Sequence, residues 1–196
     1  MSDTRLPLAG APGALGAPGT PGAPGTTLPI AETFVSVQGE GKLAGVPSWF
    51  VRLSGCNLRC AWCDTPYASW RPEKTLRSLD DLLNEAKRSG VAHAVVTGGE
   101  PLLFPGCVDL CARLRDDLKM HVTVETAGTI DLAAPMDLLS ASPKLSTSAP
   151  DGALFPKERA MHEARRENIP ALRALIDRQR AQGRDVQLKF VACEER

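Results

Sequence analysis

The sequence predicts an α/β fold in which short strands alternate with helices around one parallel sheet or barrel. Short apolar segments rich in valine and leucine alternate with longer segments whose apolar residues recur at helical spacing. Glycine-rich or polar turns follow several strands, and functional sites of such folds lie at the carboxyl ends of strands. The composition agrees, because 196 residues with 43% hydrophobic and 23% charged side chains suit one globular domain.

The N-terminal part of the chain differs from this pattern. Glycine recurs at every third position from Gly10 to Gly25, with prolines between, which is the collagen G-x-y period. A triple-helical trimerisation segment and a disordered, partly polyproline II tail are the two interpretations. The repeat is short and has almost nothing to bury, which favours the disordered tail. We therefore expect a Gly/Pro-rich tail over residues 1–28 and a folded domain over residues 29–196.

The elements of the folded part follow from periodicity. Apolar residues in alternation or in short runs predict strands over 30–37, 48–53, 92–96, 121–125, 137–141 and 186–192. Helical spacing predicts helices over 79–89, 107–118, 157–168 and 170–182. The first helix has clear end signals, because Ser78 can cap its N-terminus and Gly90 can end it.

The charge balance limits the partners of the chain. Lys plus Arg and Asp plus Glu are 23 each, so the formal net charge is zero and there is no broad basic field for nucleic acid. No apolar run approaches the length of about 18–20 residues that crosses a membrane. The N-terminus lacks the pattern of a secretory signal. We expect a cytoplasmic protein without direct nucleic-acid or membrane contact.

Three cysteines lie close together after the second predicted strand. Cys56, Cys60 and Cys63 have the spacing C-x3-C-x2-C, so one loop can bring a thiolate to each of three irons in a [4Fe–4S] cluster. No fourth cysteine follows nearby, which leaves one iron open to chelate a small molecule and favours a catalytic site. A structural zinc site is the alternative, but it needs four ligands and usually a second pair of cysteines or histidines.

This loop resembles the signature of the radical S-adenosylmethionine (SAM) superfamily. Further motifs occur in a suitable order, namely VQGEG at 37–41, FVRLSGCNL at 50–58, CDTPY at 63–67, TGGEP at 97–101 and SPK at 142–144. Together they resemble the 7-carboxy-7-deazaguanine synthases, a family of queuosine biosynthesis, over about residues 29–193. The cysteine triad identifies only the superfamily, whereas QGEG together with CDTPY is more specific.

The resemblance implies a partial, modified βα barrel of the radical SAM type, a homodimer and a carbon–nitrogen lyase reaction. SAM binds the open iron, and electron transfer from the reduced cluster releases a 5′-deoxyadenosyl radical. The radical takes hydrogen from 6-carboxy-5,6,7,8-tetrahydropterin, which rearranges to 7-carboxy-7-deazaguanine with loss of ammonia, and SAM is regenerated. Magnesium supports the rearrangement, and an electron donor such as flavodoxin or ferredoxin reduces the cluster.

The resemblance also implies a role for each matching residue, with no catalytic side chain beyond the cluster and SAM. Thr65 would offer its hydroxyl to Mg²⁺, a hard ion that prefers oxygen, although a threonine before proline is also an ordinary turn residue. Arg52 would bind the substrate carboxylate through a two-pronged hydrogen bond, unless it is a plain surface arginine. The other implied substrate contacts are Val37, Gln38, Gly39 and Thr97. The implied SAM contacts are Ala61, Trp62, Cys63, Gly99, Glu100, Ser142, Pro143 and Lys144.

Two other functions stay open. A glycyl-radical-enzyme activase shares the triad but is not expected to carry QGEG or CDTPY. A non-catalytic iron–sulfur or zinc-binding remnant is suggested by the C-terminus, because family members continue past the LKFV strand through another helix and strand. We therefore expect a chain that ends short of the family's usual C-terminus.

The remaining cysteines and histidines carry no predicted chemistry. Cys107 and Cys111 lie four residues apart on one helix, and Cys193 lies near the end of the chain. A second cluster on these three thiols is one interpretation, and buried thiols of a core helix and a core strand are the favoured one. The histidines belong to no ligand pattern.

Overall fold

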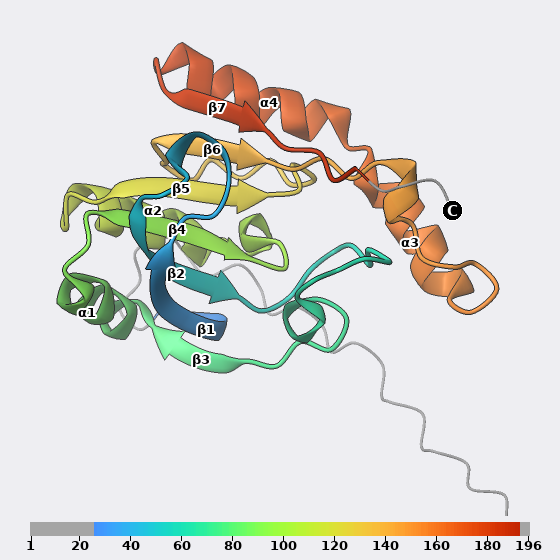
Figure 1. Cartoon of the computed structure of the whole chain (residues 1–196), viewed down its shortest axis with the longest axis horizontal. Helices are drawn as coiled ribbons and strands as arrows, with labels where there is room; N and C mark the ends of the chain where they lie inside the picture. The colour runs from blue at the N-terminus through green and yellow to red at the C-terminus, as the bar shows by residue number, and fades with distance from the viewer. Residues whose placement is uncertain (1–25, 193–196) are drawn as a thin grey trace, which may run out of the picture.

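A seven-stranded mixed sheet runs through residues 26–192, the part that the computed structural model describes (Figure 1). The strand order is β3-β1-β2-β4-β5-β6-β7, with edges at β3 and β7, so the sheet is open. The strands are β1 (Thr27–Val37), β2 (Pro47–Leu53), β3 (Thr75–Ser78), β4 (His93–Gly98), β5 (His121–Thr126), β6 (Leu138–Ala141) and β7 (Asp185–Leu188). The helices are α1 (Leu79–Ser89), α2 (Gly106–Asp116), α3 (Pro156–Arg166) and α4 (Ile169–Ala181).

The strand directions correct one expectation. Strands β2, β4, β5, β6 and β7 are parallel, but β1 pairs antiparallel with β2 and β3. The hairpin segment 38–46 joins β1 directly to β2 without a crossover helix, and such a short connection gives an antiparallel pair. The short strand β3 was not predicted, because its sequence TLRS has no apolar alternation.

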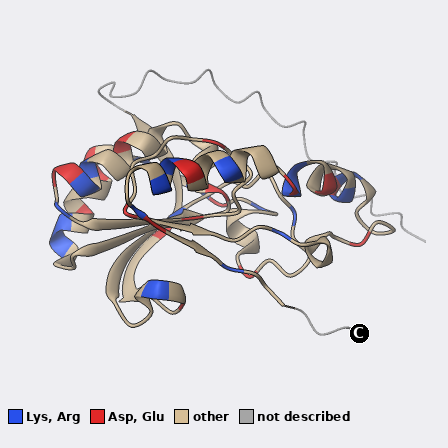
Figure 2. Ribbon diagram, turned by 90° about the horizontal axis from the view of Figure 1, so that it is seen from above, with Lys and Arg blue, Asp and Glu red and all other residues tan. Residues whose placement is uncertain are grey.

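This antiparallel pairing changes the position of the QGEG segment. Val37 pairs with Pro47 at the start of β2, at the opposite end from the cysteine loop. By register the turn starts at the amino end of β2, but the hairpin folds across one face of the sheet, so its residues still reach the carboxyl ends of the other strands. Gln38 Nε2 donates to Glu125 at the end of β5 at 3.1 Å, and the Lys42 backbone amide donates to Gln187 Oε1 at 2.8 Å, while α1, α2 and α4 lie on the other face (Figure 2).

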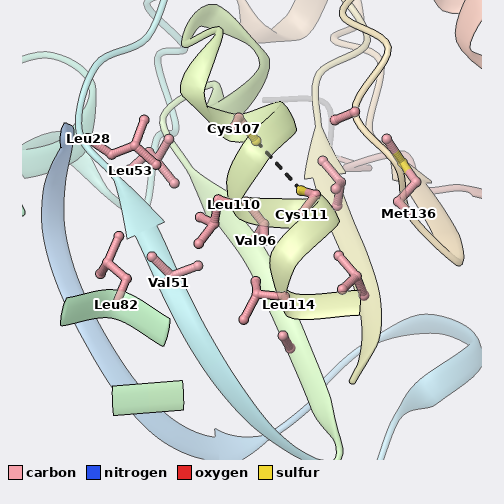
Figure 3. Close-up of a cluster of buried hydrophobic side chains, with 14 of the residues drawn as sticks. Leu28, Val51, Leu53, Leu82, Val96, Cys107, Leu110, Cys111, Leu114 and Met136 are labelled. Carbon is pink, nitrogen blue, oxygen red and sulfur yellow. Dashed lines mark hydrogen bonds between the residues drawn. The ribbon is translucent and has the colours of Figure 1, made fainter. Parts of the chain in front are cut away.

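The hydrophobic core lies between the sheet and helices α1 and α2, as Figure 3 shows for the side chains around Leu53 and Leu110. Cys107 and Cys111 are fully buried in this core, with their Sγ atoms 3.8 Å apart, so the prediction of core thiols is confirmed for this helix. Cys193 lies outside the described residues.

Leu28 is only 2% exposed and belongs to β1, so the predicted end of the tail at residue 28 was too late. The rest of that tail, residues 1–25, is outside the described part.

Most element ends agree with the sequence prediction. The predicted cap of α1 is confirmed, because Ser78 Oγ accepts a hydrogen bond from the Asp81 backbone amide, and Gly90 ends the helix in the left-handed region. The last strand is shorter than expected, since β7 ends at Leu188. The following residues, beginning with Lys189, leave the sheet and line a cavity described below. Within residues 26–192, no helix is long and apolar enough to cross a membrane.

The buried side chain of His93 predicts a loss of folding stability in mild acid. Its ring nitrogens bond to Ser48 Oγ at 2.7 Å and Thr123 Oγ1 at 2.8 Å. Burial, with a smaller effect of nearby His121, lowers the pKa of His93 from 6.5 to about 4. The folded state therefore binds a proton at His93 less well than the unfolded chain does. The free energy of unfolding is at its full value above pH 6.5 and decreases as pH falls toward 4, because protonation then favours the unfolded chain.

From pH 7 to pH 5, this histidine is expected to remove about 2 kcal/mol from the free energy of unfolding. Urea denaturation of the wild type and of His93→Gln at both pH values measures its share. The variant should lose less stability between the two pH values than the wild type does. Equal losses in both proteins would contradict the prediction.

Candidate functional site

Two adjoining cavities open where the parallel strands end. The larger has a volume of about 760 Å³ and the smaller of about 110 Å³. The cysteine loop follows β2, the TGGEP turn follows β4, and the SPK turn follows β6, so these three motifs meet at one edge of the sheet. The residues that line both cavities are Trp62, Asp64, Thr65, Gly98, Gly99, Ala127 and Lys144.

The smaller cavity is surrounded by the three thiols of the predicted cluster motif. Cys56, Cys60 and Cys63 all line it, and all three are free thiols. Within residues 26–192, no three histidine, cysteine or carboxylate side chains converge closely enough to hold a single metal ion. Three soft sulfur donors around a shared cavity fit the ligand set of an iron–sulfur cluster.

The same burial keeps the free thiols of Cys56 and Cys60 protonated. Burial raises the pKa of Cys56 from 9.0 to about 12, with the negative charge of Glu100 adding to this effect. Burial likewise raises the pKa of Cys60 to about 11, although the positive charge of Lys144 opposes it. Only thiolates ligate iron, so metal binding in this loop must release these protons.

The two glycines of TGGEP allow the cysteine loop to approach β4. Gly98 has a φ of +144°, and a Cβ there would lie 2.2 Å from the Leu53 carbonyl oxygen. A Cβ at Gly99 would lie 2.4 Å from the carbonyl oxygen of Gly55 and 2.8 Å from Cys56 Cβ. A side chain at either position would push β4 away from the loop that carries the thiols.

A buried histidine of α3 holds the cysteine loop from its other side. His162 Nδ1 accepts a hydrogen bond from the Arg59 backbone amide at 3.0 Å, so its other nitrogen carries the proton and donates to Ser148 Oγ at 2.9 Å. Burial lowers the pKa of His162, which keeps the ring neutral. Sequence reasoning missed this residue, because its partner Arg59 is distant in the chain and no local motif links them.

Glu100, one of the implied SAM contacts, is bound to the segments beside the TGGEP turn. It is fully buried, and its carboxylate accepts hydrogen bonds from Thr126 Oγ1 at 2.7 Å and from the backbone amides of Ala127 and Leu102. Burial raises its pKa, and these hydrogen bonds oppose the effect. Glu100 lines neither cavity and ties the turn after β4 to the end of β5. The implied SAM contacts Ala61 and Pro143 also line neither cavity.

The other predicted binding residues do come together. The five implied substrate contacts line the larger cavity, namely Val37, Gln38, Gly39, Arg52 and Thr97. Four implied SAM contacts line it as well, namely Trp62, Gly99, Ser142 and Lys144. Lys144 Nζ donates to Ser142 Oγ at 2.9 Å and lies 5.3 Å from the centre of the Trp62 ring. Thr65, the predicted magnesium ligand, donates to the carboxylate of Asp64 at 2.6 Å.

The larger cavity also contains charged residues that were not identified from the sequence. Glu125, at the end of β5, accepts hydrogen bonds from Gln38 Nε2 at 3.1 Å and from Thr97 Oγ1 at 2.9 Å. Lys189 Nζ lies 3.6 Å from the same carboxylate and forms an ion pair with Glu40 at 2.8 Å. A charged residue at the carboxyl end of a buried parallel strand was the available signal.

Arg52 lines the same larger cavity. Its Nε donates to Glu32 Oε1 at 2.7 Å, and its guanidinium carbon lies 5.9 Å from the centre of the Phe34 ring. Its side chain is only 19% exposed. The two terminal nitrogens of Arg52 form no hydrogen bond to any other residue of the described part, so they remain able to bind an anion in the larger cavity.

The comparisons with known proteins now define the class. Residues 50–175 match the radical SAM superfamily, and this chain belongs to that superfamily. It is 52% identical over 166 residues to the 7-carboxy-7-deazaguanine synthase of Rhodopirellula baltica and 50% identical over 172 residues to that of Halobacterium salinarum. Each match covers 85% of this chain but only 63% and 65% of the relative, so the chain spans less than two thirds of the length of these curated relatives.

A solved structure supports the fold. A crystal structure of QueE from Escherichia coli has a TM-score of 0.53 and 24% sequence identity, and the match covers 83% of this chain and 94% of that chain. This likeness concerns the fold alone. Together with the superfamily match it confirms the predicted partial barrel of the radical SAM type, here in the form of an open sheet.

Proposed function

We propose that this chain carries the catalytic core of a 7-carboxy-7-deazaguanine synthase, a carbon–nitrogen lyase that converts 6-carboxy-5,6,7,8-tetrahydropterin to 7-carboxy-7-deazaguanine. The observation that carries the proposal is the arrangement of the two cavities. A thiol-lined cavity adjoins a larger one lined by a guanidinium, a carboxylate and the QGEG segment. The two relatives that are half identical to the chain, both named for this activity, support it.

The cofactors of the proposal are a [4Fe–4S] cluster and SAM. Cys56, Cys60 and Cys63 would hold the cluster, and SAM would lie across the shared wall of the cavities near Trp62 and Gly99. When bound, this pair supplies the 5′-deoxyadenosyl radical that starts the reaction. The cation of Lys144 faces the same wall and would bind the carboxylate of SAM, while Glu100 acts as a positioning residue for the TGGEP turn.

The substrate would be recognised by opposite charges within the larger cavity. Its carboxylate would bind to the terminal nitrogens of Arg52, since a planar guanidinium matches a carboxylate with two parallel hydrogen bonds. The amino and ring N–H groups of the pterin are donors, and Glu125 offers carboxylate oxygens that accept from Gln38 and Thr97 in the free chain. The backbone of Val37 and Gly39 would complete this edge.

Magnesium is part of the proposal through Thr65. The Thr65 hydroxyl and the Asp64 carboxylate are adjacent oxygen groups that line both cavities, and Mg²⁺ prefers oxygen ligands while keeping positions for substrate. We expect Thr65→Ala to retain the cluster and SAM cleavage but to lose the stimulation of turnover by Mg²⁺. Titrating Mg²⁺ in a turnover assay measures this. If the variant depends on Mg²⁺ as the wild type does, Thr65 is not a magnesium ligand and serves only as a turn residue before Pro66.

The electron would enter from a donor protein such as a flavodoxin or ferredoxin. The cysteine loop approaches the surface at Trp70, whose Nε1 donates to the Cys60 carbonyl oxygen at 2.9 Å. The Trp70 ring lies 5.2 Å from the ring of exposed Phe155. This apolar surface beside the cysteine loop would be a docking site for the donor. The homodimer implied by the resemblance and the cytoplasmic location expected from the sequence stay predictions.

Product analysis tests the function. The anaerobically reconstituted chain is incubated with the tetrahydropterin, SAM, Mg²⁺ and dithionite, so that the result does not depend on a donor protein. Mass spectrometry is expected to find 7-carboxy-7-deazaguanine, and none without SAM. Reductive SAM cleavage without this product would favour another radical SAM reaction, such as activation of a glycyl radical enzyme. Failure to bind iron would indicate a non-catalytic remnant.

A further inference from the structure

A buried serine contacts one of the three cluster thiols. Ser69 Oγ lies 3.0 Å from Cys63 Sγ and lines the smaller cavity, and Ser69 is only 4% exposed. Neither the cysteine motif nor the CDTPY sequence includes this residue. Within the described part, no other side-chain hydroxyl makes a hydrogen bond to the three thiols; Cys56 Sγ accepts from the Leu58 backbone amide at 3.4 Å.

Ser69 is held rigidly in this position. It directly follows the short 3₁₀ helix η2 (Pro66–Ala68), and its backbone amide donates to the Pro66 carbonyl oxygen at 3.2 Å. The Ala68 carbonyl oxygen in turn accepts from the Gly55 backbone amide at 2.8 Å, next to Cys56. The backbone on both sides of the Ser69 side chain is therefore held by hydrogen bonds next to the cysteine loop. Its hydroxyl needs no rearrangement to contact a bound cluster.

Iron binding fixes the direction of this hydrogen bond. In the free thiol either group can donate, and the Ser69 hydroxyl has a second, weaker acceptor in the Thr65 carbonyl oxygen at 3.4 Å. A cysteine that ligates iron is a thiolate and can only accept. The Ser69 hydroxyl then donates to Cys63 Sγ, the nearer of its two acceptors and the charged one.

We infer that Ser69 is a positioning residue that raises the reduction potential of the cluster bound at Cys56, Cys60 and Cys63. Reduction adds one electron to the cluster, which makes its thiolate ligands more electron-rich and strengthens a hydrogen bond that they accept. Hydrogen bonds to cluster sulfurs are one of the protein's means of setting the potential. The inference rests on the cluster that superfamily membership implies, and it is independent of the proposed pterin substrate.

The test is a redox titration of the reconstituted chain, followed through the electron paramagnetic resonance signal of the reduced cluster. Ser69→Ala is expected to keep the wild-type content of iron and sulfide but to lower the equilibrium constant for reduction up to about tenfold, a negative shift of about 59 mV for one electron. Electron–nuclear double resonance of the reduced cluster should show one more coupled proton that exchanges in deuterated buffer in the wild type than in Ser69→Ala, because the variant keeps only the backbone donor to Cys56.

Two further variants separate this role from a general loss of a buried hydroxyl. Ser69→Thr keeps the hydroxyl and should keep both the potential and the exchangeable proton. Ser48→Ala removes a buried hydroxyl that bonds to His93 at the other end of β2, and should leave the potential unchanged.

An unshifted potential in Ser69→Ala with a full cluster would overturn the inference. Loss of the cluster in Ser69→Ala would also overturn it, because Ser69 would then serve assembly. Absence of pterin turnover would leave these readouts unaffected.

Discussion

Replacing any one of Cys56, Cys60 and Cys63 with alanine is expected to abolish the iron–sulfur cluster. The wild-type chain should hold about four irons and four sulfides after anaerobic reconstitution, because three thiolates each bind one iron of a cubane cluster. The three thiols line one small cavity, and a cubane held at two corners would lose its orientation and be exposed to solvent. Iron and sulfide analysis, with the visible absorption of the cluster, measures the loss.

Cys107→Ala is the matched control for this prediction. Cys107 is fully buried in α2 with its Sγ directed at Cys111 (Figure 3), and it lines neither cavity. This variant should be less stable by about 1 kcal/mol, as expected for a small core truncation, but should retain the full cluster. A triad variant that kept the wild-type iron content would contradict the assignment. So would zinc in place of iron when both metals are offered during reconstitution.

The sequence allowed the parallel part of the fold to be predicted because its signals are local. The cap at Ser78 and the stop at Gly90 define α1 within a few residues, and the valine-rich run before TGGEP defines β4. The antiparallel pairing of β1 was missed although its signal is also local, because the segment 38–46 is too short for the crossover that a parallel pair needs. The position of this hairpin over the sheet has no local signal, because the residues that hold it, such as Gln187, come from the far end of the chain.

The same distinction applies to the site. The cysteine spacing and the glycines of TGGEP are contiguous motifs, and the structure brings them to one edge of the sheet. His162 and Glu125 contact partners that are distant in sequence, so no spacing predicts these contacts, and only the place of Glu125 at the end of a strand marks it as a candidate. Glu100 is the reverse case. Its motif predicts a SAM contact, which stays a prediction, and the structure adds that its carboxylate accepts hydrogen bonds from the neighbouring turn and strand.

Arg52→Lys is expected to weaken substrate turnover strongly while leaving the cluster intact. The Nε of Arg52 is bound to Glu32, which fixes the plane of the guanidinium and leaves its two terminal nitrogens for the substrate carboxylate. A lysine can keep the ion pair with Glu32 but cannot offer two parallel hydrogen bonds. We expect a loss of about 2–4 kcal/mol in kcat/KM, with a higher KM and a lower kcat, since the carboxylate must stay fixed while the ring rearranges.

Arg77→Lys provides a control of the same chemistry in another place. Arg77 is similarly enclosed, with 26% of its side chain exposed, and pairs with Glu85 at 2.7 Å, but it lines neither cavity. Steady-state kinetics at low substrate should show wild-type kcat/KM for Arg77→Lys and the loss for Arg52→Lys, with equal iron content and equal SAM affinity in both. Wild-type kcat/KM in Arg52→Lys would mean that another cation, such as Lys189, binds the carboxylate. A parallel loss of SAM affinity in Arg52→Lys would indicate that the substitution disturbs β2 as a whole, because the two ligands are expected to contact different walls of the cavity.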